Sequence, residues 1–341
     1  MSKDRIIVLS VTIFLGLALL IVSCGDDDGT DPVIVDINLP LEVQHITPSD
    51  APVIDGTIDA IWEEMKEYSY VMKNTITGSD DLELIRMRAM TDSTNFYWLV
   101  QWMDPELNIR PDFWTYNGTV PSSSGGQDFF FAIFDDGRND TVSANCYIMC
   151  HDLEDDGDDL PDMMVNPGPG RIDVWLWTSG QSNPAYTLED LSYPADSGSR
   201  YDDVAANNAF YSNESANQPK WVHEDWPNHP TDFLYAEDTI SFDVSTMPGN
   251  IDSIPGYIIS DQSSYGGSKW DIEAHGSYDP VVGRWTLELK RALSTGNDDD
   301  IPFVIGQTIH VSFGVTNRPY YNTPYPHVGL DSTITPIEIR F

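Results

Sequence analysis

Short runs of β-branched and aromatic residues recur along the chain, with Gly, Pro, Asn and Asp between them. Runs of this kind, bounded by turn residues, predict short antiparallel strands. They are Glu83–Met90, Asn95–Met103, Asp128–Phe134, Ile172–Trp177, Thr239–Val244, Trp285–Leu289, His310–Thr316 and Ile334–Phe341. Helical periodicity is confined to Ile58–Tyr68 and, more weakly, Lys290–Leu293. The pattern predicts an all-β fold, an antiparallel β-sandwich of the jelly-roll or immunoglobulin-like kind with long loops and one or two short helices.

The segment Gly180–Glu237 has no clear period and is rich in Asn, Ser, Asp and Pro. Loops of this length inside a domain are uncommon and are usually functional or disordered. Its aromatic residues favour a packed layer over disorder; they are Tyr201, Phe210, Tyr211, Trp221, Trp226 and Phe233. A lid over a ligand and an insertion without function both fit this composition.

The N-terminus predicts an exported lipoprotein. Lys3 and Arg5 precede the apolar run Ile6–Val22, which is short for a transmembrane helix and ends at the lipobox Ile21-Val22-Ser23-Cys24. An uncleaved membrane anchor is the alternative, but Asp26, Asp27 and Asp28 follow at once. We expect a signal peptide at 1–23, a lipidated flexible tether at 24–44 and a single domain at 45–341. Cys24 would hold the protein to a membrane of the cell envelope, facing the periplasm or the cell exterior.

The chain carries 55 acidic and 17 basic residues, a formal charge of −38. Such a surface repels nucleic acid and anionic lipid headgroups, so neither is an expected partner. The acids are spread along the whole chain, which favours solubility in a salty habitat over a localised docking patch for a basic partner.

The chain also contains a motif of two cysteines and a histidine, Cys146-Tyr147-Ile148-Met149-Cys150-His151. Covalent haem needs two thiols near its vinyl groups and a histidine beside the second thiol, where the imidazole can bind the iron. Three residues between the cysteines instead of two is a rarer spacing of that motif. A Cys146–Cys150 disulfide, a zinc site and a packing histidine are the alternatives; zinc would need a further His or Cys at ligand spacing, and none follows. The motif predicts one covalent haem c.

A low-spin haem that carries electrons needs a second axial ligand. Met163 and Met164 follow His151, and a His/Met pair raises the reduction potential. Methionine also fills cores, and the sequence does not choose between these two. Lys220, His223 and Lys269 are fallback ligands, and Trp175, Trp177 and Trp221 either line the haem pocket or belong to the core.

No motif of enzyme chemistry stands out: G-x-S-x-G, Walker and G-x-G-x-x-G sequences are absent. The acidic run Asp152–Asp159 begins like an EF-hand, but its twelfth position is Met163, which favours a solvated loop over a calcium site. The sequence predicts an electron-transfer protein and no catalytic residues.

Ile54–Trp62 resembles the D-G-x-x-D-x-x-W opening of haem-binding domains related to the ethylbenzene dehydrogenase γ subunit, an opening that family 9 carbohydrate-binding modules share. The haem motif, the methionines and Arg171–Trp177 then resemble the c-type members of that group. Ile254–Ile259, Trp270–Ala274 and Gly283–Leu293 resemble its C-terminal half. The resemblance implies a β-sandwich, like that of the carbohydrate-binding modules, which holds one haem at one end and passes electrons to a partner.

In the dehydrogenase γ subunits the haem is of b type with methionine and lysine ligands, so Cys146, Cys150 and His151 depart from them. The implied redox partner is another cytochrome or a molybdopterin enzyme. This chain is then either a stand-alone cytochrome or a non-catalytic subunit of that enzyme. The rival hypothesis is a carbohydrate-binding or adhesion surface lipoprotein in which Cys146 and Cys150 form a disulfide.

Overall fold

The computed structural model of the chain describes residues 39–74, 82–116, 121–135, 170–194, 201–203, 205–226, 231–243, 245, 251–316, 327–329 and 336–341. Within them, strands dominate and helix is scarce, as the sequence predicts. No helix of this part of the chain has the length and apolar character needed to cross a membrane. The predicted signal peptide at 1–23 and most of the tether lie outside the described residues.

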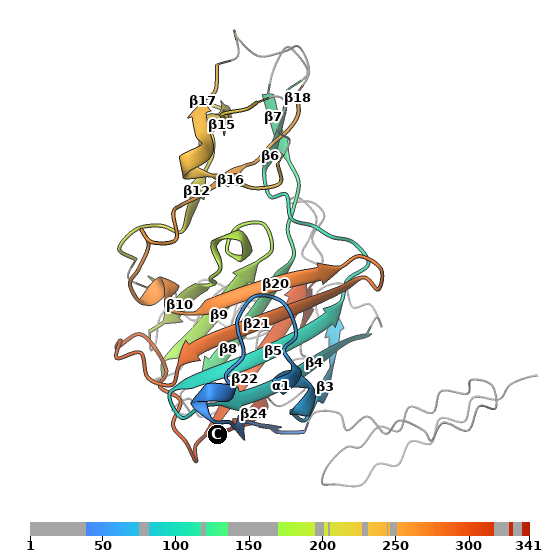
Figure 1. Ribbon diagram of the computed structural model, residues 1–341, viewed down its shortest axis with the longest axis vertical. Coiled ribbons are helices and arrows are strands. Elements are labelled where there is room, and N and C mark those ends of the chain that lie inside the picture. The colour runs from blue at the N-terminus through green and yellow to red at the C-terminus, as the bar shows by residue number, and fades with distance from the viewer. Residues whose placement is uncertain are drawn as a thin grey trace, which may run out of the picture.

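One large sheet folds over on itself to form a sandwich (Figure 1). Its front layer contains β3 (Tyr68–Asn74), β4 (Leu82–Thr91), β5 (Asn95–Met103), β21 (Arg284–Ala292) and β20 (Glu273–Asp279), paired in that order. Its back layer contains β11 (Tyr201–Asp202), β10 (Glu189–Tyr193), β9 (Ile172–Thr178), β8 (Phe129–Asp135), β22 (Thr308–Thr316) and β24 (Ile337–Arg340). The strand β23 (His327–Gly329) pairs with β22 and β3 and so joins the layers. These pairs are antiparallel, which confirms the predicted antiparallel β-sandwich.

The remaining elements are short. At the sandwich edges are β1 (Leu41–Glu42), β2 (Gln44–His45) and the turns η1 (Pro48–Asp50), η2 (Asn183–Ala185) and η4 (Ser268–Trp270). Smaller sheets, seen above the sandwich in Figure 1, contain β6 (Phe113–Tyr116), β7 (Pro121–Ser124), β12 (Phe210–Ser212), β13 (Glu214–Ser215), β14 (Gln218–Pro219), β15 (Trp221–His223), β16 (Leu234–Tyr235), η3 (Ala236–Asp238), β17 (Thr239–Ser241), β18 (Ile251–Ile254) and β19 (Tyr257–Ile259). Four aromatic residues of the predicted layer in 180–237 therefore lie on short strands: Tyr201, Phe210, Tyr211 and Trp221.

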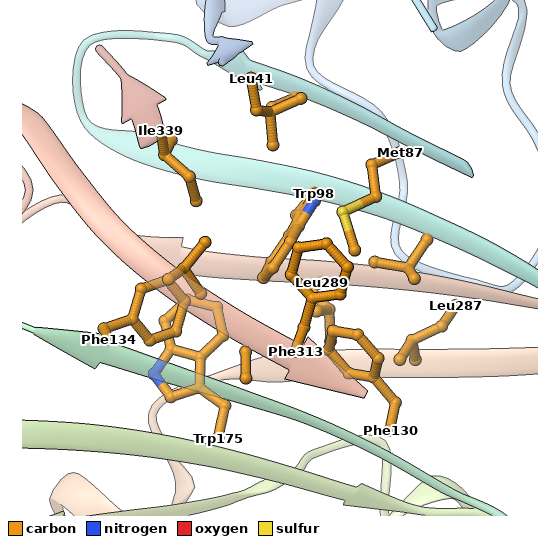
Figure 2. Packing of buried hydrophobic residues seen from close by; sticks show 14 of the residues in the cluster. Leu41, Met87, Trp98, Phe130, Phe134, Trp175, Leu287, Leu289, Phe313 and Ile339 are labelled. Carbon is orange, nitrogen blue, oxygen red and sulfur yellow. The ribbon is translucent and has the colours of Figure 1, made fainter. Parts of the chain in front are cut away.

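Aromatic side chains fill the space between the two layers (Figure 2). Trp98 of β5 is fully buried and packs against three rings of the back layer, Phe130, Phe134 and Phe313, with ring centroids 5.6, 6.1 and 6.4 Å away. Alternate residues of each strand point to opposite faces, so every second residue of β5, β8 and β22 enters this core. Burial of rings of this size is the main stabilising contribution to the sandwich.

Two helix predictions need correction. The helix expected at Ile58–Tyr68 is the single helix α1 (Ala60–Glu64), because Met65 is already extended and Tyr68 starts β3. The weaker helix expected at Lys290–Leu293 is wrong, because Lys290 to Ala292 continue β21 and pair with β5. Hydrogen bonding to strands on both sides overrides the local periodicity there.

Candidate functional site

The haem motif lies on a connection between two paired strands. Asp135, the last residue of β8, is opposite Ile172, the first residue of β9. The chain therefore leaves the back layer and re-enters it at the same end of the sandwich, and residues 136–169 lie in between. We call this the motif end. Cys146, Cys150, His151, Met163 and Met164 belong to 136–169, and these residues, like Cys24, lie outside the described part of the chain.

An apolar face adjoins the two ends of that connection. On the outer side of the back layer, five residues form a cluster of their own: Ile133, Ile172, Val174, Leu191 and Tyr193. They alternate with residues that point into the core, such as Phe134 and Trp175. The outer face of β8, β9 and β10 is therefore apolar and buried, which is unusual for the solvent side of an antiparallel sheet.

Two tryptophans considered for a haem pocket belong to the sandwich core. Trp175 and Trp177 are fully buried. Trp175 lies 4.6 Å from Phe134 between ring centroids, and Trp177 lies 5.1 Å from Trp285. Both point to the inner face of β9, because residues two apart along a strand share a face. Their neighbours are thus rings of the sandwich core, as expected of tryptophan in a sandwich.

The other tryptophan and the fallback ligands lie in different surroundings. Trp221 of β15 is partly exposed, with the Lys220 ammonium 3.9 Å from its ring centroid. His223 accepts a hydrogen bond at Nδ1 from the backbone N–H of Asp225. Lys269 is buried and forms an ion pair with Glu189, 3.1 Å from Nζ to Oε2. An ammonium group held by a carboxylate has no free lone pair for iron, so Lys269 is a poor candidate ligand.

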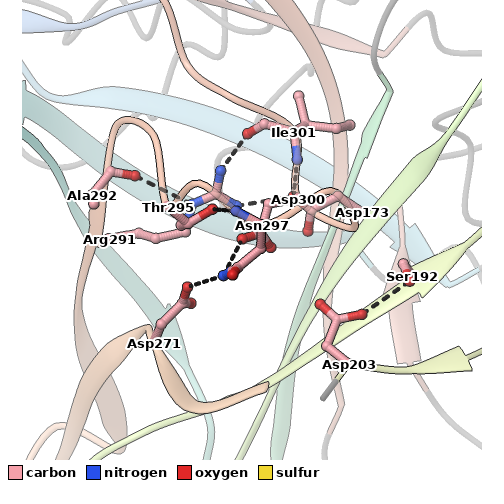
Figure 3. Close-up of polar contacts among 10 residues, drawn as sticks. All are labelled: Asp173, Ser192, Asp203, Asp271, Arg291, Ala292, Thr295, Asn297, Asp300 and Ile301. Atoms are coloured by element: carbon pink, nitrogen blue, oxygen red, sulfur yellow. Dashed lines mark hydrogen bonds and ion pairs between the residues drawn. The ribbon is translucent and has the colours of Figure 1, made fainter. Parts of the chain in front are cut away.

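A charged network occupies the inner margin of the motif end (Figure 3). Arg291 of β21 is buried, and its Nη1 lies 2.9 Å from Oδ2 of Asp173 on β9, so the pair joins the two layers. Its guanidinium carbon also lies 4.3 Å from the Phe303 ring centroid. Burial raises the pKa of Asp173 although Arg291 opposes the shift. A buried pair of this kind costs desolvation but is strongly destabilising to break.

At the other end of the sandwich two carboxyl groups are buried together. Asp104 follows β5 and Asp128 precedes β8, and both are almost completely buried. Burial, followed by the charge of Asp104, raises the pKa of Asp128 to about 8. Burial also raises the pKa of Asp104 to about 6. Oδ2 of Asp128 accepts hydrogen bonds from the backbone N–H of Asn108 and the indole N–H of Trp285, both at 3.0 Å.

The described residues contain a tyrosine-lined cavity of about 200 Å³. Tyr186, Tyr235 and Tyr265 line it together with Glu237 and Asp261. Ligand cavities usually measure roughly 300–1,000 Å³. This cavity is therefore small for anything beyond a single small molecule.

The residues of the D-G-x-x-D-x-x-W opening converge on one buried carboxylate. Glu288 of β21 accepts hydrogen bonds from the indole N–H of Trp62 at 2.7 Å and from the backbone N–H of Gly56 at 2.8 Å. Asp59 accepts from the backbone N–H of Val53 at 2.8 Å, and Gly56 has φ of 78°. The motif residues thus fix a tight loop and α1 to the outer face of the front layer, a role in the fold rather than in ligand binding.

The described residues define an all-β sandwich in which a long motif-bearing connection leaves one end of the back layer. The profile of the ethylbenzene dehydrogenase family matches residues 45–318, and the chain belongs to that family. The family includes haem-binding redox proteins related to the γ subunit. No curated protein matches the chain.

Two solved structures are similar in fold, both at low identity. A family 9 carbohydrate-binding module from Caldicellulosiruptor kristjanssonii, solved with glucose, is 11% identical with a TM-score of 0.37, and the match covers 88% of this chain and 94% of that one. A putative carbohydrate-binding protein from Bacteroides uniformis is 7% identical with a TM-score of 0.39, and the match covers 88% and 98%. Neither similarity informs on a ligand of this chain.

Proposed function

We propose that the protein is a membrane-anchored mono-haem c-type cytochrome that transfers electrons outside the cytoplasm and is not itself an enzyme. The observation that supports this most directly is the position of Cys146, Cys150 and His151 within the profile match of a family that includes haem-binding redox proteins. The donor set fits covalent haem: two thiols for the vinyl groups, an imidazole beside the second thiol, and a thioether from Met163 or Met164.

The architecture at the motif end suits a haem. The connection 136–169 starts and ends beside the apolar outer face of β8, β9 and β10. A porphyrin is largely apolar and needs an apolar wall, and burial tunes the potential of its iron. Haem supplies one-electron chemistry, whereas this chain's residues attach it, bind its iron and hold it on a stiff sandwich. A stiff support limits the movement that accompanies each change of redox state.

The anchor and the partner are part of the same proposal. Cys24 carries lipid and 24–44 is the tether to the domain, so the cytochrome works at a membrane surface of the cell envelope. Its redox partner is another cytochrome or a molybdopterin enzyme, with the chain as stand-alone carrier or as haem subunit.

The test compares the wild-type chain with Cys146→Ser, Cys150→Ser and Cys24→Ala variants, all expressed with the cytochrome c maturation machinery. Haem staining after denaturing electrophoresis should persist in wild type and Cys24→Ala and be lost when both motif thiols are replaced. The Cys24→Ala protein should no longer be found in the membrane fraction. Haem stain that survives without both thiols would contradict thioether attachment.

A further inference from the structure

Five carboxyl groups from separate parts of the chain meet at the inner margin of the motif end, next to Arg291. We call them the carboxylate cluster; its members are Asp173 of β9, Asp190 of β10, Asp203 after β11, and Asp299 and Asp300 between β21 and β22. The strand register explains why two of these groups are close together. Asp173 and Trp175 are two residues apart on β9 and so share its inner face, and Asp190 of β10 is opposite Trp175. Both aspartates therefore lie on the inner face of the back layer.

The members form two sets that share one residue. Oxygens of Asp173, Asp190 and Asp300 all lie within 4.8 Å of one another, and so do oxygens of Asp203, Asp299 and Asp300. Each member of the first set is buried. Two oxygens on opposite sides of a Ca²⁺ ion, each about 2.4 Å from it, are about 4.8 Å apart. The spacing is therefore that of ligands around one cation.

Protein donors occupy only one oxygen of each paired carboxylate (Figure 3). Oδ2 of Asp173 accepts from Arg291 at 2.9 Å and from the backbone N–H of Ile301 at 3.1 Å. Oδ2 of Asp300 accepts from Asn297 at 3.2 Å, and Oδ1 of Asp203 accepts from Ser192 at 2.9 Å. The second oxygen of each is buried and has no hydrogen-bond partner among the described residues.

Asp190 is the most informative member. Its side chain is completely buried, and neither of its carboxylate oxygens has a hydrogen-bond partner in the part of the chain that the structure describes. Burial, followed by the charge of Asp173, raises its pKa well above the ordinary value. A buried charge without a partner is strongly unfavourable, and proteins usually pair such groups or bind a metal with them. Arg291 does not fulfil this role, because it donates to Asp173 and to the carbonyls of Ile301 and Ala292.

We propose that the carboxylate cluster is a calcium site, with Asp173, Asp190 and Asp300 as ligands and Asp203 and Asp299 in the adjoining set. The three ligands and Arg291 together carry an excess of two negative charges, which one divalent cation neutralises. All the ligand atoms are oxygens, which suit Ca²⁺ and Mg²⁺ rather than zinc. A buried set of carboxylates favours calcium over magnesium, because magnesium keeps several of its waters.

The site joins three separated segments near the two ends of the connection 136–169. Asp173 pairs with Phe134, and this pair is next to the pair Asp135–Ile172, from which the connection departs. Bound calcium would tie β9 and β10 to the connection between β21 and β22. The inference rests on the described carboxylates alone and holds whether or not the chain carries haem.

The test is a calcium titration of the purified full chain in detergent after treatment with a chelator. Calorimetry should show saturable binding of one or two Ca²⁺ per chain at concentrations up to about 10 mM. The melting temperature should rise by about 5 °C or more once calcium exceeds the dissociation constant about a hundredfold. Mg²⁺ at the same concentration should give less than half of that shift.

Asp190→Asn is the diagnostic variant and Asp243→Asn the control, since Asp243 is exposed and lies away from the cluster. Without calcium, Asp190→Asn should be at least as stable as wild type, because a buried unpaired charge is removed. It should lose the calcium-dependent rise in melting temperature, which Asp243→Asn should keep. Absence of saturable binding to wild type, an equal shift with Mg²⁺, or a full calcium shift in Asp190→Asn would overturn the proposal.

Discussion

The indole N–H of Trp62 donates a 2.7 Å hydrogen bond to Oε1 of Glu288, which lies far along the chain in β21. Oε2 of the same carboxylate accepts from the backbone N–H groups of Gly56 and Asp55, at 2.8 and 3.2 Å. One buried side chain thus satisfies two donors of the loop that precedes α1 and one donor of α1 itself. Burial raises the pKa of Glu288 to about 7 in spite of these donors.

Glu288→Ala should destabilise the fold by about 3 kcal/mol, because it leaves buried donors without an acceptor. Glu288→Gln should lower the free energy of unfolding by less than Glu288→Ala does. The glutamine amide keeps one acceptor oxygen, although it turns an NH₂ group toward a donor. Urea denaturation measures both. The control is Glu273→Gln, whose carboxylate is exposed and pairs with Lys290; its effect should stay below about 1 kcal/mol. Equal effects of Glu288→Gln and Glu273→Gln would contradict this role.

Stability should depend on pH through Asp128. Its pKa in the folded protein is about 8, above the ordinary value, so between about pH 4 and pH 8 the folded state holds a proton that the unfolded chain has released. The free energy of unfolding should therefore fall as pH rises through this window, by at most about 1.4 kcal/mol per pH unit for each such proton. Urea denaturation at several pH values in the presence of a chelator measures the slope.

Asp128→Asn should flatten that slope between about pH 6 and pH 8. The variant keeps an oxygen to accept from Asn108 and Trp285, and its NH₂ group replaces Oδ1, which has no hydrogen-bond partner. Asp243→Asn should leave the slope as in wild type, since that carboxylate is exposed. A slope that Asp128→Asn does not change would show that Asp128 is ionised throughout.

Gly276 of β20 marks a close contact between the layers. A Cβ atom there would lie 2.4 Å from Cζ2 of Trp177. Gly276→Ala should therefore destabilise the fold by about 2 kcal/mol, since overpacking a core typically costs 1–3 kcal/mol. Gly266→Ala is the matched control, because a Cβ at Gly266 meets nothing within 4 Å. Thermal denaturation of the two variants side by side should show a clear difference, and equal melting temperatures would contradict the contact.

The distal haem ligand is a prediction from the proposed function. One of Met163→Ala and Met164→Ala should change the visible spectrum of the reduced protein and lower its reduction potential, because a thioether ligand raises the potential. The other variant is the internal control and should match wild type. If neither variant changes the spectrum or the potential, the distal ligand is not in this pair.

Much of the fold follows from local sequence, and the differences have physical causes. Asn95–Met103 is predicted with its observed bounds because its aromatic and branched residues suit a strand buried on both faces. The helix predicted at Lys290–Leu293 fails because β5 pairs with Lys290 to Ala292 and β20 pairs with Lys290 on the other side. No local pattern contains those partners, which come from remote parts of the chain.

The carboxylate cluster escaped prediction because 55 acidic residues make any one of them uninformative. A usable signal was nevertheless present in Ile172-Asp173-Val174-Trp175, where a charge occupies the same alternating face as a buried tryptophan. Asp190 shows the same pattern in β10, but its meeting with Asp300 depends on the tertiary fold. The haem motif is the reverse case: the sequence alone predicts it, and its residues lie outside the described part of the chain.

The proposed function requires that Cys146 and Cys150 hold a haem whose iron His151 binds. A pyridine haemochrome spectrum tests this on the wild-type chain, expressed with the cytochrome c maturation machinery and purified from membranes. We expect a c-type spectrum with one haem per chain. A colourless protein in which Cys146 and Cys150 are oxidised to each other would contradict it and would favour the carbohydrate-binding lipoprotein.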